Sequence, residues 1–420
     1  MVDRDRKAGS DTIIDTNDAI GAIPETIDRD FRSATRGRIL VSATDDAFAL
    51  CSPPQGTEYQ MIQSFEVENF RSFRSLELRG LPAVNIIVGK SASGKTALLE
   101  ALRMALGGTP AVAWVLNGTR GIVVPIVPNP TREQFEAAWK SYFLDFDISK
   151  TITFKIIDSE RRNASLKMYF DQDRPVTPLP GNPPFHPGMP ALTNTIIPLT
   201  FKRRAFTGEE STLDATIHQQ QLGQLFLQQG PELGTVSEFF PSTWQSNAQQ
   251  VASWFSQLKI SNRSDDIVDI VRRQFPDISE LSSETPYGVA SVYATVKHHS
   301  EMMPVALVSS GINKFMSLLI AIRTYRGGVV LIDEIENGIY YKMFPALWEA
   351  LHKFAIANKT QLFLSSHSWE CLRGAASVID KHTKDFSLIQ VLHDKGVSEA
   401  LVAAGQNAAA AIESGIEVRK

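Results

Sequence analysis

Hydrophobic and polar residues alternate clearly from residue 61 onward. Ile62, Phe65 and Val67 predict one strand, and Leu76 with Leu78 predicts a second strand that returns beside it. The stretches 151–157 and 164–170 alternate in the same way and predict a hairpin. The pattern therefore begins with antiparallel strands.

A different order of elements follows, in which short apolar runs alternate with amphipathic stretches. Strands are expected at 83–88, 288–296, 305–308, 329–332, 361–364 and 386–391, and helices at 97–106, 133–145, 312–325, 342–357 and 369–379. Repeated strand–helix alternation is typical of a parallel sheet. The predicted fold class is α/β, with a mixed sheet that carries an antiparallel edge.

Three stretches break this pattern. Residues 1–60 are polar, mixed in charge and strand-like only at 38–42, so we expect a mostly disordered extension; Met61, directly before the first strand, is a plausible alternative start. Residues 172–190 are rich in proline and predict a loop. Residues 208–280 read as helical. The expected domains are the extension 1–60, an N-terminal lobe 61–205, a helical insertion or lid 206–285, and a C-terminal lobe 286–420. No heptad pattern lasts long enough for a long coiled coil.

Composition narrows the class of protein. The 420 residues are 43% hydrophobic and 21% charged, with a net charge of −4, which is ordinary for a globular protein. A nucleic-acid contact would need a local patch such as 202–204, although the sequence favours a solvated strand end there. Two cysteines, Cys51 and Cys371, fit a reducing cytoplasm. We find no apolar run of membrane length and no apolar signal core, so we expect a cytoplasmic protein without a membrane partner.

Residues 89–96 carry the strongest chemical signal. They read G-x-x-x-x-G-K-T between a predicted strand and a predicted helix, which is the context of a phosphate-binding P-loop. Backbone N–H groups of such a loop and of the following helix cradle phosphate oxygens. Lys95 would reach the β- and γ-phosphates of ATP, and the Thr96 hydroxyl would bind Mg²⁺. The expected nucleotide-binding residues here are Gly89, Lys90, Ser91, Ala92, Ser93, Gly94, Lys95 and Thr96. The alternative is a glycine-rich turn that matches by chance.

An apolar strand at 329–332 ends in two carboxylates, which is the pattern of a Walker B motif. Asp333 would hold Mg²⁺, and Glu334 would act as general base toward the attacking water. An acidic cap on a buried strand is the alternative interpretation. One strand later, His367 lies in a serine-rich turn and would sense the γ-phosphate; alone, it would read as a polar loop histidine.

Two further positions complete the predicted site. Ser309, Ser310 and Gly311 open a predicted helix and could bind an anion through hydroxyl and N–H groups. They resemble the signature motif of ABC-type ATPases, which binds ATP held by the opposite subunit, although a simple helix cap has the same residues. Asn337 with Gly338 occupies the place of a D-loop, and equally suits a plain turn.

Taken in this order, the motifs resemble those of the ABC-class AAA ATPases related to RecF, SMC and OLD proteins. The closest likeness is to the ATPase subunits of bacterial phage-defence systems, such as Septu-like, retron-associated and PARIS-like systems. The matching stretches are 65–73, 89–96, 309–314, 332–338 and 365–368, and the ending 411–419 is similar as well. The resemblance implies an ATP-sandwich dimer, action of Ser310 and Gly311 across the interface, and a role for Arg71 near the nucleotide.

The chain departs from that family at three points. Ser91 stands where Asn is usual and Tyr340 where His is common, which leaves the turnover rate open. A carboxylate-rich TOPRIM nuclease segment does not follow His367, which argues against an OLD-type nuclease.

The resulting hypothesis is Mg²⁺-dependent ATP hydrolysis at a head-to-head interface of a homodimer or higher homo-oligomer. It would control a partner effector, a nuclease or toxin, in defence against phage. The alternatives are a nucleotide-gated scaffold with little turnover and a RecF-like DNA-binding repair ATPase.

Overall fold

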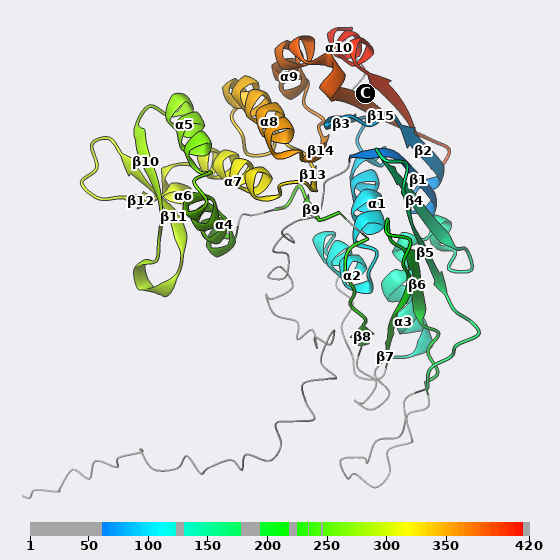
Figure 1. Ribbon diagram of the computed structural model, residues 1–420. Helices are drawn as coiled ribbons and strands as arrows, with labels where there is room; N and C mark the ends of the chain where they lie inside the picture. Colours follow the sequence, from blue (N-terminus) through cyan, green and yellow to red (C-terminus); the bar gives the residue numbers. More distant parts are fainter. Residues whose placement is uncertain are drawn as a thin grey trace, which may run out of the picture. The chain divides into compact units, whose positions relative to one another are not determined.

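The computed structural model describes residues 61–122, 130–177, 194–217, 225–233, 235–244 and 247–414. Within these residues the strands form three sheets, of seven, six and three strands (Figure 1). The predicted extension 1–60, the strand-like 38–42, Cys51 and most of the proline-rich loop lie outside the described residues. So do residues 415–420, which include most of the family-like ending.

The largest sheet is antiparallel throughout. Its strand order is β2 (Phe73–Arg79), β1 (Ile62–Phe70), β4 (Ile152–Asp158), β5 (Asn163–Phe170), β6 (Leu199–Arg204), β7 (Glu210–Ile217) and β8 (Leu225–Leu227). Buried and exposed residues alternate along β4 and β5, as expected of strands with one face on a core. The predicted pair β1–β2 and the predicted hairpin β4–β5 are confirmed.

The six-stranded sheet carries the P-loop strand at its centre. Its order is β16 (Val397–Ala404), β15 (Phe386–Asp394), β3 (Val84–Val88), β14 (Gln361–Ser365), β13 (Val329–Ile332) and β9 (Ser237–Phe240). Every pair is parallel except β15–β16, which is an antiparallel hairpin. The mixed sheet with an antiparallel edge is therefore confirmed, but β16 forms the antiparallel edge, whereas β1 and β2 belong to the other sheet.

Strands β3, β13 and β14 are buried on both faces of the six-stranded sheet, which explains their continuous apolar sequences. Successive residues of one strand enter different cores: Ile86 packs in one hydrophobic cluster and Ile87 in the other, and Val330 and Leu331 divide in the same way. Helix α1 (Lys95–Gly107) fills the space on one face and contacts both this sheet and strands β1 and β4 of the antiparallel sheet. The P-loop helix is thus held between the two sheets.

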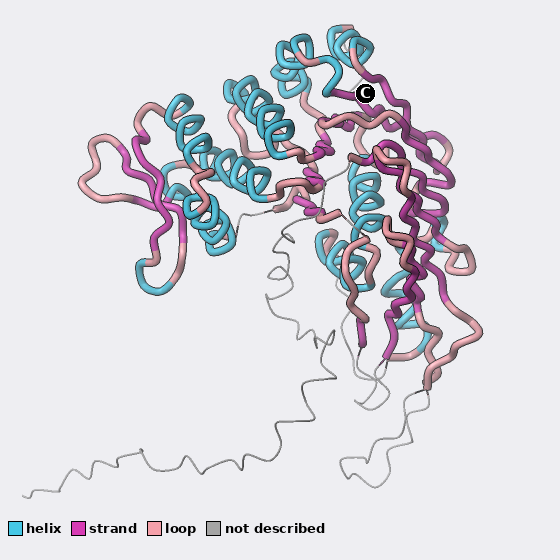
Figure 2. Tube along the Cα trace, viewed as in Figure 1, coloured by secondary structure: helices cyan, strands magenta, loops and turns pink. Residues whose placement is uncertain are grey.

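The other face is covered by four helices of the C-terminal half. These are α7 (Ser310–Thr324), α8 (Phe344–Asn358), α9 (Trp369–Lys381) and α10 (Gln406–Glu413) (Figure 2). Helices α2 (Pro110–Thr119) and α3 (Arg132–Trp139) pack with the antiparallel sheet through Ala113, Leu116 and Trp139.

A small third sheet begins within the segment 206–285 that was predicted to be an insertion. It consists of β10 (Ile278–Glu284), β11 (Ser291–Val296) and β12 (Met303–Pro304), and packs with α4 (Ala248–Ile260), α5 (Asp265–Gln274) and the short α6 (Val305–Val308). Contacts between α4 and α7 connect this unit directly to the helix that begins at the predicted signature residues.

Two predictions of secondary structure are wrong, and a third predicted element is shorter than expected. The segment 206–285 is not mainly helical, because Glu210–Ile217 is a strand of the seven-stranded sheet and β8 and β9 also precede α4; only α4 and α5 fit the prediction. Val305–Val308 forms a helical turn rather than a strand. The predicted helix 133–145 ends at Trp139 and continues as two 3₁₀ turns, Lys140–Tyr142 and Leu144–Phe146.

Candidate functional site

The P-loop closes between β3 and α1 with backbone geometry that requires glycine. Gly89 has a φ of 151°, and a Cβ there would collide with the carbonyl oxygen of Val391 on β15. Gly94 directly precedes α1 with a φ of 110°, in the left-handed region that disfavours other residues. The first N–H groups of α1 are left to point into the loop, which is the arrangement an anion needs.

Lys95 folds back over this loop. Its Nζ donates to the carbonyl oxygens of Gly89 and Lys90, at 2.9 Å each. Burial lowers the pKa of Lys95, and the negative charge of Asp333 opposes that shift. The ammonium group is therefore already directed into the loop and has neutral carbonyl partners that a phosphate could replace.

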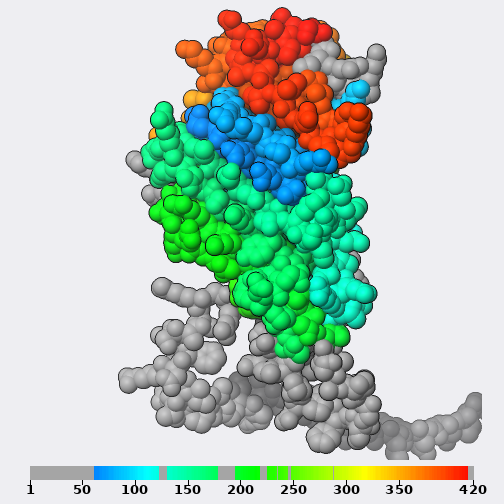
Figure 3. All heavy atoms as spheres, turned by 90° about the vertical axis from the view of Figure 1, so that its right-hand side faces the viewer, coloured from blue at the N-terminus to red at the C-terminus, as the bar shows by residue number. Residues whose placement is uncertain are grey.

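The loop is also held from outside by the C-terminal hairpin. Ser398 of β16 is buried, and its Oγ donates to the carbonyl oxygen of Ser93 at 2.7 Å and lies 2.9 Å from Oγ of Ser72. Figure 3 shows the C-terminal strands in red and orange beside the blue surface of β1 and β2. Sequence reasoning did not identify β16, and nothing in the motif itself signals this support.

The two predicted Mg²⁺ ligands meet directly. Thr96 Oγ1 donates to Asp333 Oδ2 at 2.8 Å, across 237 positions of sequence. The second oxygen of Asp333 accepts from Oγ of Ser365 at 2.5 Å. These side chains supply hard oxygen atoms from the ends of α1, β13 and β14, which is the donor chemistry that Mg²⁺ prefers. The residues present therefore fit Mg²⁺, with Ser365 as an orienting residue that the sequence did not reveal.

Glu334 lies at the start of a strained turn. Its φ is +50°, and its N–H donates to Ser365 Oγ at 2.8 Å. Its carboxylate accepts from Nδ2 of Asn337 at 2.5 Å. A non-glycine residue in the left-handed region is uncommon and is maintained by such surrounding contacts.

His367 contacts a second carboxylate, that of Glu336, for which the sequence indicated no role. Its Nδ1 lies 3.0 Å from Glu336 Oε1 and 3.8 Å from Glu334 Oε1, and its backbone N–H donates to Glu336 Oε1 at 2.7 Å. The other oxygen of Glu336 is buried without a hydrogen-bond partner. His367 thus stands between two acids, and Glu336 positions it.

The predicted signature residues begin α7, as expected. Ser309 is the N-cap, and its Oγ accepts weakly from the N–H of Ile312 at 3.5 Å. A Cβ on Gly311 would lie 3.0 Å from the carbonyl oxygen of Gly338. The signature helix and the D-loop turn therefore approach each other within one chain, and Ser310 is exposed beside them.

Lys314, one turn into α7, is a further member that sequence reasoning left without a role. Its ammonium lies 5.6 Å from the centre of the Trp244 ring. Burial lowers the pKa of Lys314, whereas the negative charge of Glu334 opposes the shift. The carboxylate half of the site therefore has a lysine of its own.

Arg71 packs against α1 one turn beyond Thr96. Its Nε forms an ion pair with Glu100 Oε2 at 2.8 Å, without hydrogen-bond alignment, and its guanidinium lies 4.9 Å from the centre of the Tyr142 ring. Arg120 binds the same carboxylate through two hydrogen bonds. Burial lowers the pKa of Arg71, opposed mainly by Glu100. Nη2 of Arg71 is buried without a hydrogen-bond partner. A contact between Arg71 and nucleotide stays a prediction.

Two family models match the parts of the chain that build this site. Residues 232–372 match "AAA domain, putative AbiEii toxin, Type IV TA system", and residues 64–113 match an AAA domain model. The first contains the signature, Walker B and His367 residues, and the second contains the P-loop.

Two proteins of similar sequence also carry names that indicate nucleotide-dependent functions or DNA repair. An "ATP/GTP phosphatase" of Helicobacter pylori is 22% identical over 363 residues, which cover 78% of this chain and 90% of that protein. A DNA replication and repair protein RecF of Heliobacterium modesticaldum is 45% identical over 47 residues, which cover 11% of this chain and 13% of RecF.

Solved structures resemble the chain more loosely. An SMC head bound to the C-terminal winged-helix domain of ScpA covers 82% of this chain with a TM-score of 0.44 and 13% identity. The Pyrococcus furiosus Smc head domain with an extended coiled coil covers 84% with a TM-score of 0.45 and 11% identity.

Among the described residues, we find no helix that combines the length and the apolar character needed to cross a membrane. The P-loop half and the Walker B half meet at Thr96 and Asp333, and each lies in a segment that an AAA model matches. The chain is an ATPase with an AAA-type domain, whose two halves lie at 64–113 and 232–372.

Proposed function

We propose that the chain hydrolyses ATP with Mg²⁺ at a site that a second copy of the chain completes. The observation that carries this proposal is the hydrogen bond between Thr96 and Asp333, because it brings the P-loop and Walker B residues to the place where Mg²⁺ and the phosphates would lie. Mg²⁺, when bound, would neutralise charge on the phosphates. Lys95 would bind the β- and γ-phosphates beside it.

Glu334 is the proposed general base. It follows Asp333 directly, and its carboxylate lies in the same hydrogen-bonded turn as Asn337 and near His367. Orienting a water for in-line attack needs a carboxylate near the γ-phosphate, with no covalent step by the protein. His367, beside it, would report the presence of the γ-phosphate through its contact with Glu336.

The second copy would supply Ser309, Ser310 and Gly311. Exposed apolar side chains flank these residues and the D-loop: Leu307 is 76% exposed, and Tyr340 and Tyr341 are 55% exposed each. Large exposed side chains of this kind are enriched at protein interfaces. Asn337 would lie at the same interface, next to the bound nucleotide.

The wider role is proposed to be control of an effector protein, a nuclease or toxin, in defence against phage in the cytoplasm. Support comes from the resemblance of the motifs to ATPases of defence systems, and from the match of 232–372 to a model whose description names a toxin. If the chain is such an ATPase, its turnover should change when the effector is added. Turnover that ignores the effector would argue for an isolated ATPase.

A second candidate is a DNA-binding ATPase similar to RecF, favoured by the short match at 45% identity. It predicts DNA affinity that falls steeply with salt, because phosphate contacts release counterions. Affinity without this slope would exclude it.

Steady-state phosphate release tests the central proposal. Wild type should hydrolyse ATP only with Mg²⁺, Lys95→Ala should be inactive, and Lys259→Ala, an exposed lysine on α4, should behave as wild type. Hydrolysis that survives EDTA or Lys95→Ala would overturn the proposal.

A further inference from the structure

A cluster of two histidines and an aspartate lies apart from the nucleotide-binding motifs. His352 is in α8, His382 directly follows α9, and Asp385 ends the 3₁₀ turn Thr383–Asp385 that leads into β15. Each offers one nitrogen or oxygen ligand atom, and these atoms all lie within 4.8 Å of one another. The three side chains come from three successive segments of the C-terminal half.

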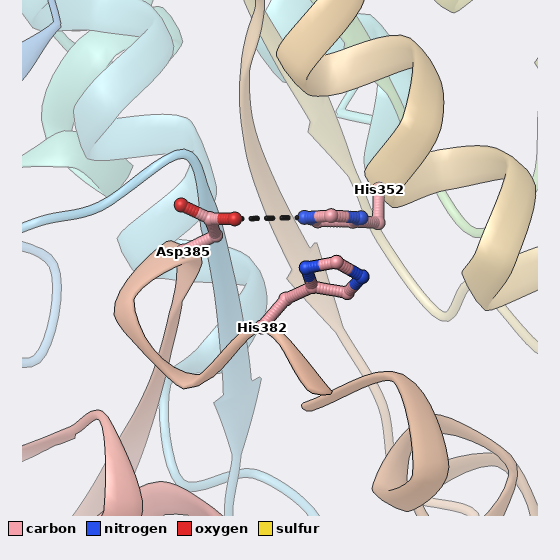
Figure 4. A group of neighbouring side chains, drawn as sticks. All are labelled: His352, His382 and Asp385. Carbon is pink, nitrogen blue, oxygen red and sulfur yellow. Dashed lines mark hydrogen bonds and ion pairs between the residues drawn. The ribbon is translucent and has the colours of Figure 1, made fainter. Parts of the chain in front are cut away.

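The cluster is organised on one side of His352. Its Nε2 lies 2.9 Å from Asp385 Oδ2, and its ring stacks on that of His382 with the ring centres 4.1 Å apart. Figure 4 shows that His382 also presents a nitrogen on the side from which Asp385 approaches. Phe386, which is buried, stacks on His352 as well and limits how the imidazole can turn.

This donor set fits a transition-metal dication. Two imidazoles and one carboxylate are ligands for Zn²⁺, at about 2.0–2.2 Å each, with a fourth tetrahedral position left for water. Tetrahedral ligands at about 2.1 Å would be roughly 3.3–3.4 Å apart. The present separation of 2.9 Å between His352 and Asp385 would have to open by about half an ångström, and the two stacked imidazoles would have to tilt so that both nitrogens face the ion.

The exposed fractions of the three side chains agree with a site that is open to solvent and in which the first ligand is held by packing. The side chain of His352 is 12% exposed and that of Asp385 is 36% exposed, and His382 is exposed. A metal could therefore enter from solvent, while α8 and the stacked Phe386 hold the first ligand in place. Among the residues that the structure describes, this is the group of three or more such side chains that could hold a metal ion.

We propose that His352, His382 and Asp385 form a binding site for Zn²⁺ or a similar transition-metal dication. Bound metal would cross-link α8 to the end of α9 and to the segment before β15. Helix α9 begins just after His367 and has 13 residues, so the metal would lie about 20 Å from that histidine along the helix. The site is thus separate from the one proposed for Mg²⁺ and ATP.

Calorimetric titration of the untagged, EDTA-treated full chain with Zn²⁺ tests this inference. Excess Mg²⁺ and ADP should be present throughout, so that oxygen ligands of the nucleotide site are occupied. We expect one equivalent of Zn²⁺ to bind, and expect His382→Ala and Asp385→Asn each to weaken binding at least about tenfold. Both substitutions replace exposed or half-exposed side chains, and circular dichroism of the metal-free variants checks their folding.

A second readout and two controls separate this site from other histidines. Zn²⁺ should raise the melting temperature of wild type and leave that of His382→Ala unchanged. His298→Ala with His299→Ala removes another exposed histidine pair, and His367→Ala removes the one beside Glu336; both should bind Zn²⁺ as wild type does. The inference is overturned if wild type binds no stoichiometric Zn²⁺, if the cluster variants retain full affinity, or if His367→Ala abolishes binding.

Discussion

The P-loop half and the carboxylate half of the site differ in how they are held. In the P-loop half, Lys95 donates to carbonyl oxygens of its own loop, which a phosphate can replace. In the carboxylate half, Glu334 is bound by Asn337, and His367 is bound by Glu336. The first half is thus arranged to bind nucleotide, whereas the proposed catalytic groups are engaged with each other.

This difference suggests that the P-loop half binds the nucleotide and the carboxylate half catalyses its hydrolysis. A preformed loop lets one chain bind ATP without rearrangement, which lowers the cost of binding. Catalysis would need Glu334 and His367 to exchange their partners for water and the γ-phosphate. A Cβ on Gly311 would lie 3.0 Å from the carbonyl oxygen of Gly338, so the signature helix and the D-loop turn adjoin within one chain. We propose that a second copy docking beside them causes that exchange.

The largest expected effect comes from Lys95→Ala. Removal of the ammonium deletes charge-assisted hydrogen bonds to phosphate, so affinity for ATP should fall about 100-fold. Binding of a fluorescent ATP analogue measures this loss, with Lys259→Ala as the control. An affinity of Lys95→Ala for ATP within about twofold of that of wild type would contradict the assignment of nucleotide binding to the P-loop half.

Glu334→Gln should have a large effect of a different kind. Loss of the general base should lower kcat by about 100-fold to 1000-fold, while ATP still binds. ATP-bound dimers should accumulate, as measured by light scattering after size-exclusion chromatography. Normal turnover in this variant would remove Glu334 from the role of base and leave the carboxylate half without its main function.

Glu336→Gln should have a moderate effect and sharpen the comparison. The amide oxygen can still accept from the His367 N–H, but the negative charge beside the imidazole is lost. We expect kcat to change about tenfold with little change in ATP affinity. Glu370→Gln, a substitution in the first turn of nearby α9, is the matched control. Equal effects of the two variants on kcat would show that Glu336 does not act on His367 in the way proposed.

Ser365→Ala should have the smallest effect, and it should fall on the carboxylate half. The hydroxyl donates to Asp333 and accepts from Glu334 N–H, so its loss should cost about 1–2 kcal/mol of stability. Urea denaturation measures this cost, and Ser414→Ala, an exposed serine at the end of α10, is the control. Activity should fall by less than tenfold, with the Mg²⁺ requirement shifted to higher concentration. Unchanged stability and unchanged Mg²⁺ dependence would mean that Ser365 does not orient Asp333.

Sequence predicted most of the fold around the site, because the motifs there are local. The strand before Gly89 and the helix after it follow from a glycine-rich turn between an apolar run and strong helix formers. The helical reading of 206–285 failed where β7 begins, because Glu210–Ile217 has few large apolar residues and gains its order from pairing with β6 and β8. The apolar run Val305–Val308 predicts a strand but forms a helical turn, since the period of so short a run does not distinguish the two.

The site itself was predictable only in part. Thr96 and Asp333 follow from motifs, and their contact follows from the fold. Glu336, Ser365 and Ser398 act through contacts made over 31 to 305 positions of sequence, and such pairings leave no local pattern. Their roles depend on the way parallel strands end at one edge of the sheet.

The most direct test of the shared site mixes two inactive variants. Lys95→Ala removes the P-loop lysine of one copy. Ser310→Arg, at an exposed position, blocks the signature residues of the other copy. A mixed dimer contains one site with both defects and one intact site, so an equal mixture should recover about a quarter of wild-type ATPase activity if copies pair at random. Recovery at that level is the result we predict. No recovery, from variants shown by light scattering to exchange and dimerise, would contradict the claim that two copies build one site.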